Sequence, residues 1–105
     1  MNVQFTSHGR RRLSERLHGS RPATHRQRCL EAWASTETSE TLRLLREQNA
    51  EPRYPIKYEY RLWAGMIYVF RHYVSTETIQ LITTFSHQSP ESTLLYQEFN
   101  QWAKR

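Results

Sequence analysis

The sequence has 105 residues, of which 37% are hydrophobic and 12% aromatic, and it carries a net charge of +5. This length suits one domain, and large aromatic rings supply a core that a disordered chain would lack. Cys29 is the only cysteine, so an internal disulfide is excluded. The sequence also lacks a signal-peptide pattern and a long apolar run, which predicts a cytoplasmic protein with no membrane contact.

The positive charge is concentrated near the amino end of the chain. Residues 8–28 hold seven arginines against one glutamate, whereas residues 31–51 hold five glutamates against two arginines. Thirteen of the fifteen cationic side chains are arginine, whose planar fork of donors fits phosphate. The basic segment therefore indicates a surface that attracts polyanions, and the alternative is a hydrated helical surface with no ligand.

The first half of the chain predicts three helices, over residues 8–18, 22–34 and 40–48. Ser7 is the expected cap of the first helix, and Pro22 suits the first turn of the second. The side chains expected to face inward are Leu13 and Leu17, then Cys29, Leu30 and Trp33, then Leu42 and Leu45.

The pattern changes to an alternating one after the prolines of residues 51–55. Strands are predicted over residues 56–63, 66–73 and 78–85. The two connections between them, Ala64-Gly65 and 74–76, are short enough to force an antiparallel meander.

A closing helix is predicted over residues 90–104, since Ser89-Pro90-Glu91 is a strong start signal. Leu95, Phe99 and Trp102 recur at helical spacing and should lie on the sheet. The expected fold is therefore one α+β domain spanning residues 1–105, with amino-terminal helices, a three-stranded antiparallel meander and a carboxy-terminal helix.

His8, Arg12 and Arg16 are spaced four residues apart and fall along one stripe of the first predicted helix. Two guanidiniums can hold a phosphodiester and stabilise added charge on its oxygens, while an imidazole passes protons near neutral pH. The alternative is that the arginines form ordinary surface pairs with Glu15 and that His8 merely lies near a helix cap.

The stretch Ser7-His8-Gly9-Arg10-Arg11-Arg12-Leu13-Ser14-Glu15-Arg16-Leu17 resembles the opening of a family of small bacterial and phage domains of unknown function. In architecture those domains resemble the RelE, colicin and barnase-like ribonuclease toxins. The segments 63–70 and 81–85 fit the same layout, so the likeness covers most of residues 5–85. The helix at 90–104 departs from the family pattern.

The resemblance implies metal-independent RNA cleavage without a cofactor. His8 would then be the base or the acid, and Arg12 and Arg16 would hold the phosphate. The further catalytic candidates are Arg61, Arg71 and His87. The candidate nucleic-acid contacts are Arg10, Arg11, Lys57, Tyr60, Tyr68 and Thr84. The competing interpretation assigns the tyrosines to the core and lets the sheet arginines keep one face hydrated.

Three functions therefore stay open. The first is an endoribonuclease acting on RNA, with an antitoxin or host protein as a further partner. The second is a non-catalytic phage or bacterial regulator that binds nucleic acid or a host protein through the basic helix. The third is a protein-interaction module that uses its last helix or a sheet edge. A metal site at His25 and Cys29 is not expected because two ligands are too few.

Overall fold

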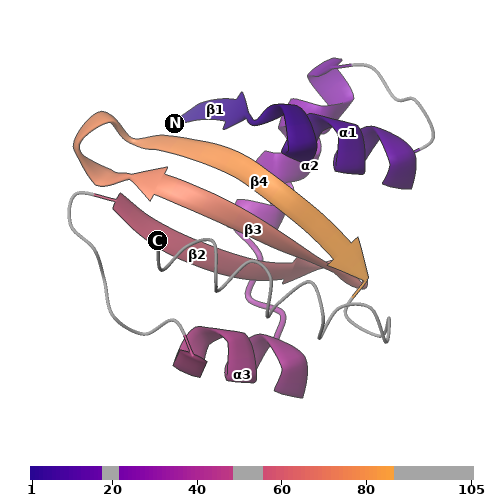
Figure 1. Ribbon diagram of the computed structural model, residues 1–105, viewed down its shortest axis with the longest axis vertical. Coiled ribbons are helices and arrows are strands. Elements are labelled where there is room, and N and C mark those ends of the chain that lie inside the picture. The colour runs from indigo at the N-terminus through magenta and orange to yellow at the C-terminus, as the bar shows by residue number, and fades with distance from the viewer. Residues whose placement is uncertain (18–21, 49–55, 87–105) are drawn as a thin grey trace.

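The computed structural model describes residues 1–17, 22–48 and 56–86 of the chain. Within these residues the protein is α+β, with three helices and one four-stranded mixed sheet. The strands are β1 (Asn2–Phe5), β2 (Ile56–Trp63), β3 (Met66–Tyr73) and β4 (Thr78–Ser86), and the helices are α1 (Ser7–Arg16), α2 (Pro22–Trp33) and α3 (Glu40–Gln48). Figure 1 shows the sheet with α1 near its β1–β4 side and α3 near its β2 side.

The prediction of a three-stranded meander is wrong in its strand count. Strands β2, β3 and β4 do pair antiparallel in chain order, but β1 adds a fourth strand parallel to β4. The sheet order is therefore β1-β4-β3-β2, with β1 and β2 at the two edges. The sequence did not predict β1 for two reasons. β1 has only four residues, too few for a clear alternation, and its partner β4 lies at the far end of the described chain.

Local capping explains where the helices begin. The side chain of Thr6 accepts a hydrogen bond from the backbone N–H of Gly9 at 2.9 Å, so Thr6 rather than the predicted Ser7 caps α1. Pro22 opens α2 as predicted. Ser39 caps α3 by accepting from the backbone N–H of Leu42 at 3.1 Å.

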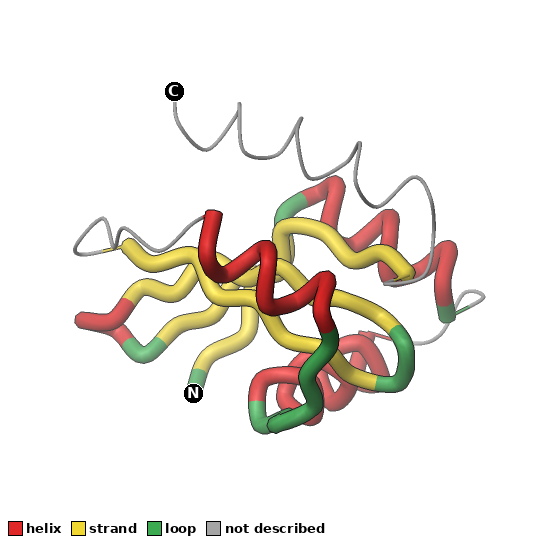
Figure 2. Tube along the Cα trace, turned by 90° about the horizontal axis from the view of Figure 1, so that it is seen from below, coloured by secondary structure: helices red, strands yellow, loops and turns green. Residues whose placement is uncertain are grey.

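The core consists of two clusters of buried residues. One joins α3 to β2, β3 and β4 and contains Leu42, Leu45, Tyr60, Leu62, Ile67, Val69 and Phe85. The other joins α1 and α2 to β3 and β4 and contains Leu13, Cys29, Ala32, Tyr68, Phe70, Ile79 and Leu81. Helices thus pack against both faces of the sheet, as Figure 2 shows from below, and the inward positions predicted for Leu13, Cys29 and Leu42 are confirmed.

Two irregularities shape the sheet. Ala64 and Gly65 both have positive φ, 52° and 78°, in the tight turn between β2 and β3. A shift of register between Val69 and Phe70 changes the pairing of β3 with β4. The predicted helix over 90–104 lies outside the described residues, and no described helix is long and apolar enough to cross a membrane.

Candidate functional site

The first turn of α1 lies directly on β4. Gly9 is buried, and a Cβ atom built there would be 2.2 Å from the carbonyl oxygen of Leu81. The backbone N–H of Thr6 donates to the same oxygen at 3.1 Å, and the Thr6 side chain lies 3.3 Å from it. Only glycine allows this approach, and the contact fixes the position of the neighbouring His8 relative to the sheet.

His8 is exposed, yet both nitrogens of its ring have partners. Nε2 lies 3.3 Å from the hydroxyl oxygen of Thr83 on β4, and Nδ1 lies 3.1 Å from Nη2 of Arg11. Since a guanidinium only donates, Nδ1 is the acceptor, which puts the proton of a neutral ring on Nε2, facing Thr83. Partial burial, then Arg12 and Arg11, hold the pKa of His8 below its ordinary value, and Glu15 opposes them.

The arginines of α1 have different surroundings. Arg12 pairs with Glu15 at 3.3 Å, as the surface-pair alternative expected. Arg10 places its guanidinium 5.0 Å from the centre of the Phe5 ring. Arg16 is exposed in the last turn of the helix. Arg11, expected only as a nucleic-acid contact, is therefore the arginine whose side chain meets the imidazole.

Arg61 and Arg71 do not join His8. Arg61 lies on the edge strand β2, where its Nε donates to the carbonyl oxygen of Trp33 at 3.1 Å. Arg71 lies on β3, where Nη1 is 3.3 Å from the hydroxyl of Tyr73 and its guanidinium lies 5.8 Å from the Tyr58 ring centre. The expectation that these arginines complete the site of His8 is not met, because Arg61 is held by Trp33 of α2 and by Glu59, while Arg71 is held by Tyr73 of its own strand.

The sheet residues predicted to contact nucleic acid are mostly buried. Tyr60, Tyr68 and Thr84 are buried, with exposed fractions of 2%, 0% and 1%. A buried ring cannot stack on a base, so the competing interpretation that Tyr60 and Tyr68 belong to the core is the correct one. The backbone of Lys57 pairs with His72, while its side chain and His87 lie outside the described residues.

Two neighbours of His8 were missed from the sequence. Thr83 rather than Thr84 meets the imidazole, because Thr84 faces the buried ring of Tyr68 across the β3–β4 pairing. Glu15 was expected only as a partner of the arginines, yet it also raises the pKa of His8. The spacing of Glu15 from His8, seven residues on a helix, places both on one side and could have revealed this neighbour.

The described residues hold no group of three or more His, Cys, Asp or Glu side chains able to bind a metal ion. Burial raises the pKa of the Cys29 thiol to about 12, which leaves it unreactive at neutral pH.

Comparison with protein-family models, with curated proteins and with solved structures found no match. The functional argument therefore begins from geometry: an exposed, neutral imidazole lies beside a strand hydroxyl and near the guanidiniums of Arg11 and Arg12.

Proposed function

We propose that the protein acts on RNA as a metal-independent endoribonuclease whose centre is His8. The observation that carries the proposal is the pair of contacts on the His8 ring, with Thr83 at Nε2 and Arg11 at Nδ1. A lowered pKa keeps this imidazole neutral at neutral pH, the state that a general base requires. The likeness of residues 7–17 to the opening of toxin-like domains supports the same activity and the RelE-like or barnase-like fold. The single cysteine, Cys29, suits a cytoplasmic place of action.

The proposed reaction begins when a phosphate attracts Arg11. A charge-assisted hydrogen bond to phosphate is stronger than the bond that Arg11 donates to Nδ1, so binding frees the lone pair of Nδ1. Nδ1 then takes the proton of the ribose 2′-hydroxyl, whose oxygen bonds to phosphorus while the bond from phosphorus to the 5′-oxygen breaks. Protonated His8 returns that proton to the leaving oxygen, and Arg11 and Arg12 stabilise the added charge.

Incubation of the purified protein with mixed RNA in the presence of EDTA tests this function. Cleavage should leave 2′,3′-cyclic phosphate ends and should fall by at least about a hundredfold in the His8→Ala variant, since a general base contributes a factor of that order. Ser7→Ala is the matched control, because Ser7 is exposed beside His8 in the same helical turn. Equal cleavage by His8→Ala would overturn the assignment.

The rate should also depend on pH in a defined direction. The base form of His8 is lost as pH falls through its pKa, which lies below the ordinary value of about 6.5. Cleavage should therefore be nearly constant around neutral pH and should decline only in more acidic buffer. A decline centred above neutral pH would point to another base.

The second candidate is a non-catalytic nucleic-acid binder. It is favoured by one observation: both ring nitrogens of His8 are occupied and Arg12 is paired with Glu15. For such a binder, the affinity for RNA should survive His8→Ala but weaken in Arg11→Ala, and no cyclic phosphate ends should appear. An antitoxin or host protein remains a proposed further partner of either activity.

A further inference from the structure

Two guanidiniums converge on one carbonyl oxygen at the outer edge of β2. Nη2 of Arg46 on α3 donates to the carbonyl oxygen of Tyr60 at 2.8 Å, and Nη1 of Arg61 donates to the same oxygen at 3.1 Å. Among the described residues β2 is an edge strand, and β3 is its only neighbour in the sheet. Two like charges thus face each other across a single acceptor.

The charges at this edge are only partly balanced. Glu59 lies 3.0 Å from Nη1 of Arg61, and no ion pair among the described residues includes Arg46. Burial, then Arg61, lowers the pKa of Arg46, and Glu59 opposes them. One carboxylate for two guanidiniums leaves a local positive charge whose repulsion a bound anion would relieve.

Arg61 is held in place before any ligand arrives. Its Nε donates to the carbonyl oxygen of Trp33, and its guanidinium lies 4.5 Å from the centre of the Trp33 ring. Nη2 of Arg61 and Nη1 of Arg46 carry none of the hydrogen bonds found among the described residues. A fixed guanidinium beside a second, more exposed one is the arrangement that binds a tetrahedral oxyanion through several donors.

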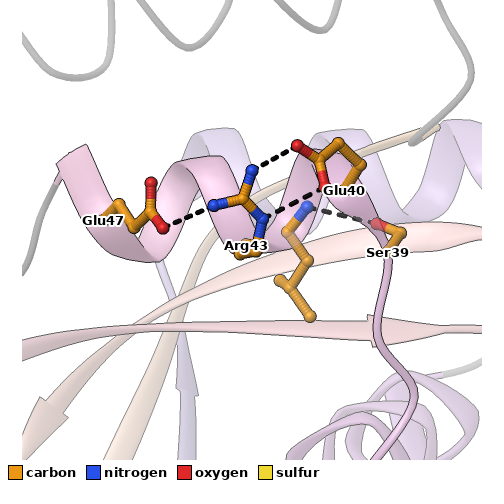
Figure 3. A network of polar contacts seen from close by, with 5 residues as sticks. Ser39, Glu40, Arg43 and Glu47 are labelled. Atoms are coloured by element: carbon orange, nitrogen blue, oxygen red, sulfur yellow. Dashed lines mark hydrogen bonds and ion pairs between the residues drawn. The ribbon is translucent and has the colours of Figure 1, made fainter.

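Arg43, one turn earlier on α3, shows the opposite situation. Its guanidinium bonds to Glu40 and to Glu47, so its charge is already balanced by two carboxylates (Figure 3). Arg43 and Arg46 therefore have the same side chain on the same helix, but only Arg46 lies beside a second cation. This difference supplies a matched control.

We propose that Arg46 and Arg61 form a phosphate-binding site at the outer edge of β2. The ligand is a phosphate group, either in a nucleic-acid backbone or on a free phosphorylated molecule. The site lies at the opposite sheet edge from β1 and the start of α1, and it does not depend on cleavage at His8.

Titration of the intact protein with inorganic phosphate at constant ionic strength tests the site. The side-chain Nε–H signals of Arg46 and Arg61, followed by NMR, should shift and saturate together. Arg46→Gln should weaken phosphate binding by about tenfold, the loss of a charge-assisted pair, and Arg43→Gln should change it by less than about twofold. Glu59→Gln should strengthen binding, because it removes the carboxylate that competes with phosphate for Arg61.

A parallel titration with a short single-stranded oligoribonucleotide identifies the source of the phosphate. A weaker affinity in Arg46→Gln than in Arg43→Gln assigns the site to a nucleic-acid backbone, and an unchanged affinity assigns it to a free phosphorylated molecule. The proposal is overturned if phosphate shifts neither guanidinium signal, or if Arg43→Gln weakens phosphate binding as much as Arg46→Gln. Either result is independent of whether His8→Ala abolishes cleavage.

Discussion

Two histidines on the amino-terminal helices illustrate how burial decides the role of a side chain. His8 is exposed and has a partner at each ring nitrogen. His25 is only 4% exposed, its ring centre lies 6.4 Å from that of Phe5, and its Nε2 has no partner in the described part of the chain. Burial and then Arg10 lower the pKa of His25, so His25 is a neutral core residue that acid destabilises.

The stability of the protein should consequently fall in acid. The unfolded chain binds a proton at His25 near the ordinary pKa of about 6.5, whereas the folded chain binds it only at lower pH. The stabilising contribution is therefore complete above this value and is lost as pH falls through the window down to the folded-state pKa. Urea unfolding at about pH 7.5 and about pH 5 should record this loss.

His25→Leu should remove part of this acid sensitivity. Because the leucine leaves no buried polar atom without a partner, its stability at neutral pH should match that of the natural protein within about 1 kcal/mol. His72→Gln is the control, since His72 is only half buried beside Trp33. An unchanged acid sensitivity in His25→Leu would contradict this role of His25.

At the scale of elements, the sequence predicted what local patterns determine. The bounds of α3, β2 and β3 match the prediction because each has a clear start signal or alternation of its own. β1 and the contact between α1 and β4 could not be predicted, since they depend on pairing of residues 2–5 with residues 78–81. The register shift after Val69 likewise determines which threonine of β4 contacts His8. No pattern in the sequence predicts this shift.

The candidate site was predictable in its helical half only. The spacing of His8 and Arg12 placed them on one exposed side of α1, and the structure agrees. The sheet half of the prediction was wrong because Arg61 contacts Trp33 of α2, Arg71 contacts Tyr73 of β3, and neither arginine contacts His8. Side chains distant in sequence gather only through tertiary pairing, which the alternation of single strands does not encode.

Gly9 should be indispensable for docking α1. Gly9→Ala places a methyl group against the carbonyl oxygen of Leu81, so the helix must move away from β4 at a cost of about 2–3 kcal/mol. The displacement should separate His8 from Thr83 and lower RNA cleavage beyond the loss of stability. Urea unfolding and cleavage assays below the unfolding transition measure the two effects.

Gly65→Ala is the matched control for this prediction. No atom lies within 4 Å of a Cβ at Gly65, but its φ of 78° is strained for alanine. The change should therefore cost about 1 kcal/mol without altering cleavage by the folded protein. If both variants lose activity equally, Gly9 has no special part in positioning His8.

Across the whole described molecule, arginines form two separate regions of unbalanced positive charge. The surface of α1 carries Arg10, Arg11 and Arg16, and the far edge of the sheet carries Arg46 with Arg61. On the outer side of α3, by contrast, Arg43 is neutralised by two glutamates. Positive charge that could attract an anion therefore lies at two separate places on the described part of the molecule.

Binding of single-stranded RNA should thus depend strongly on salt. Each phosphate contact lowers the slope of log affinity against log salt by about 0.7, so Arg11→Gln and Arg16→Gln should each make the slope shallower by about that amount. Fluorescence anisotropy over a range of potassium chloride concentrations measures the slope. Arg43→Gln should leave it unchanged, and an equal effect of all three variants would show that only net charge matters.

The parallel pairing of β1 with β4 also determines when β1 gains its place in the sheet during synthesis. Residues 2–5 leave the ribosome before residues 78–81 and must wait for that later strand before they gain their hydrogen-bond partners. His8 meets Thr83 only after that closure, so a nascent chain has the basic helix but not the oriented imidazole. Under the proposed function, synthesis itself would then postpone RNA cleavage until β4 has been made.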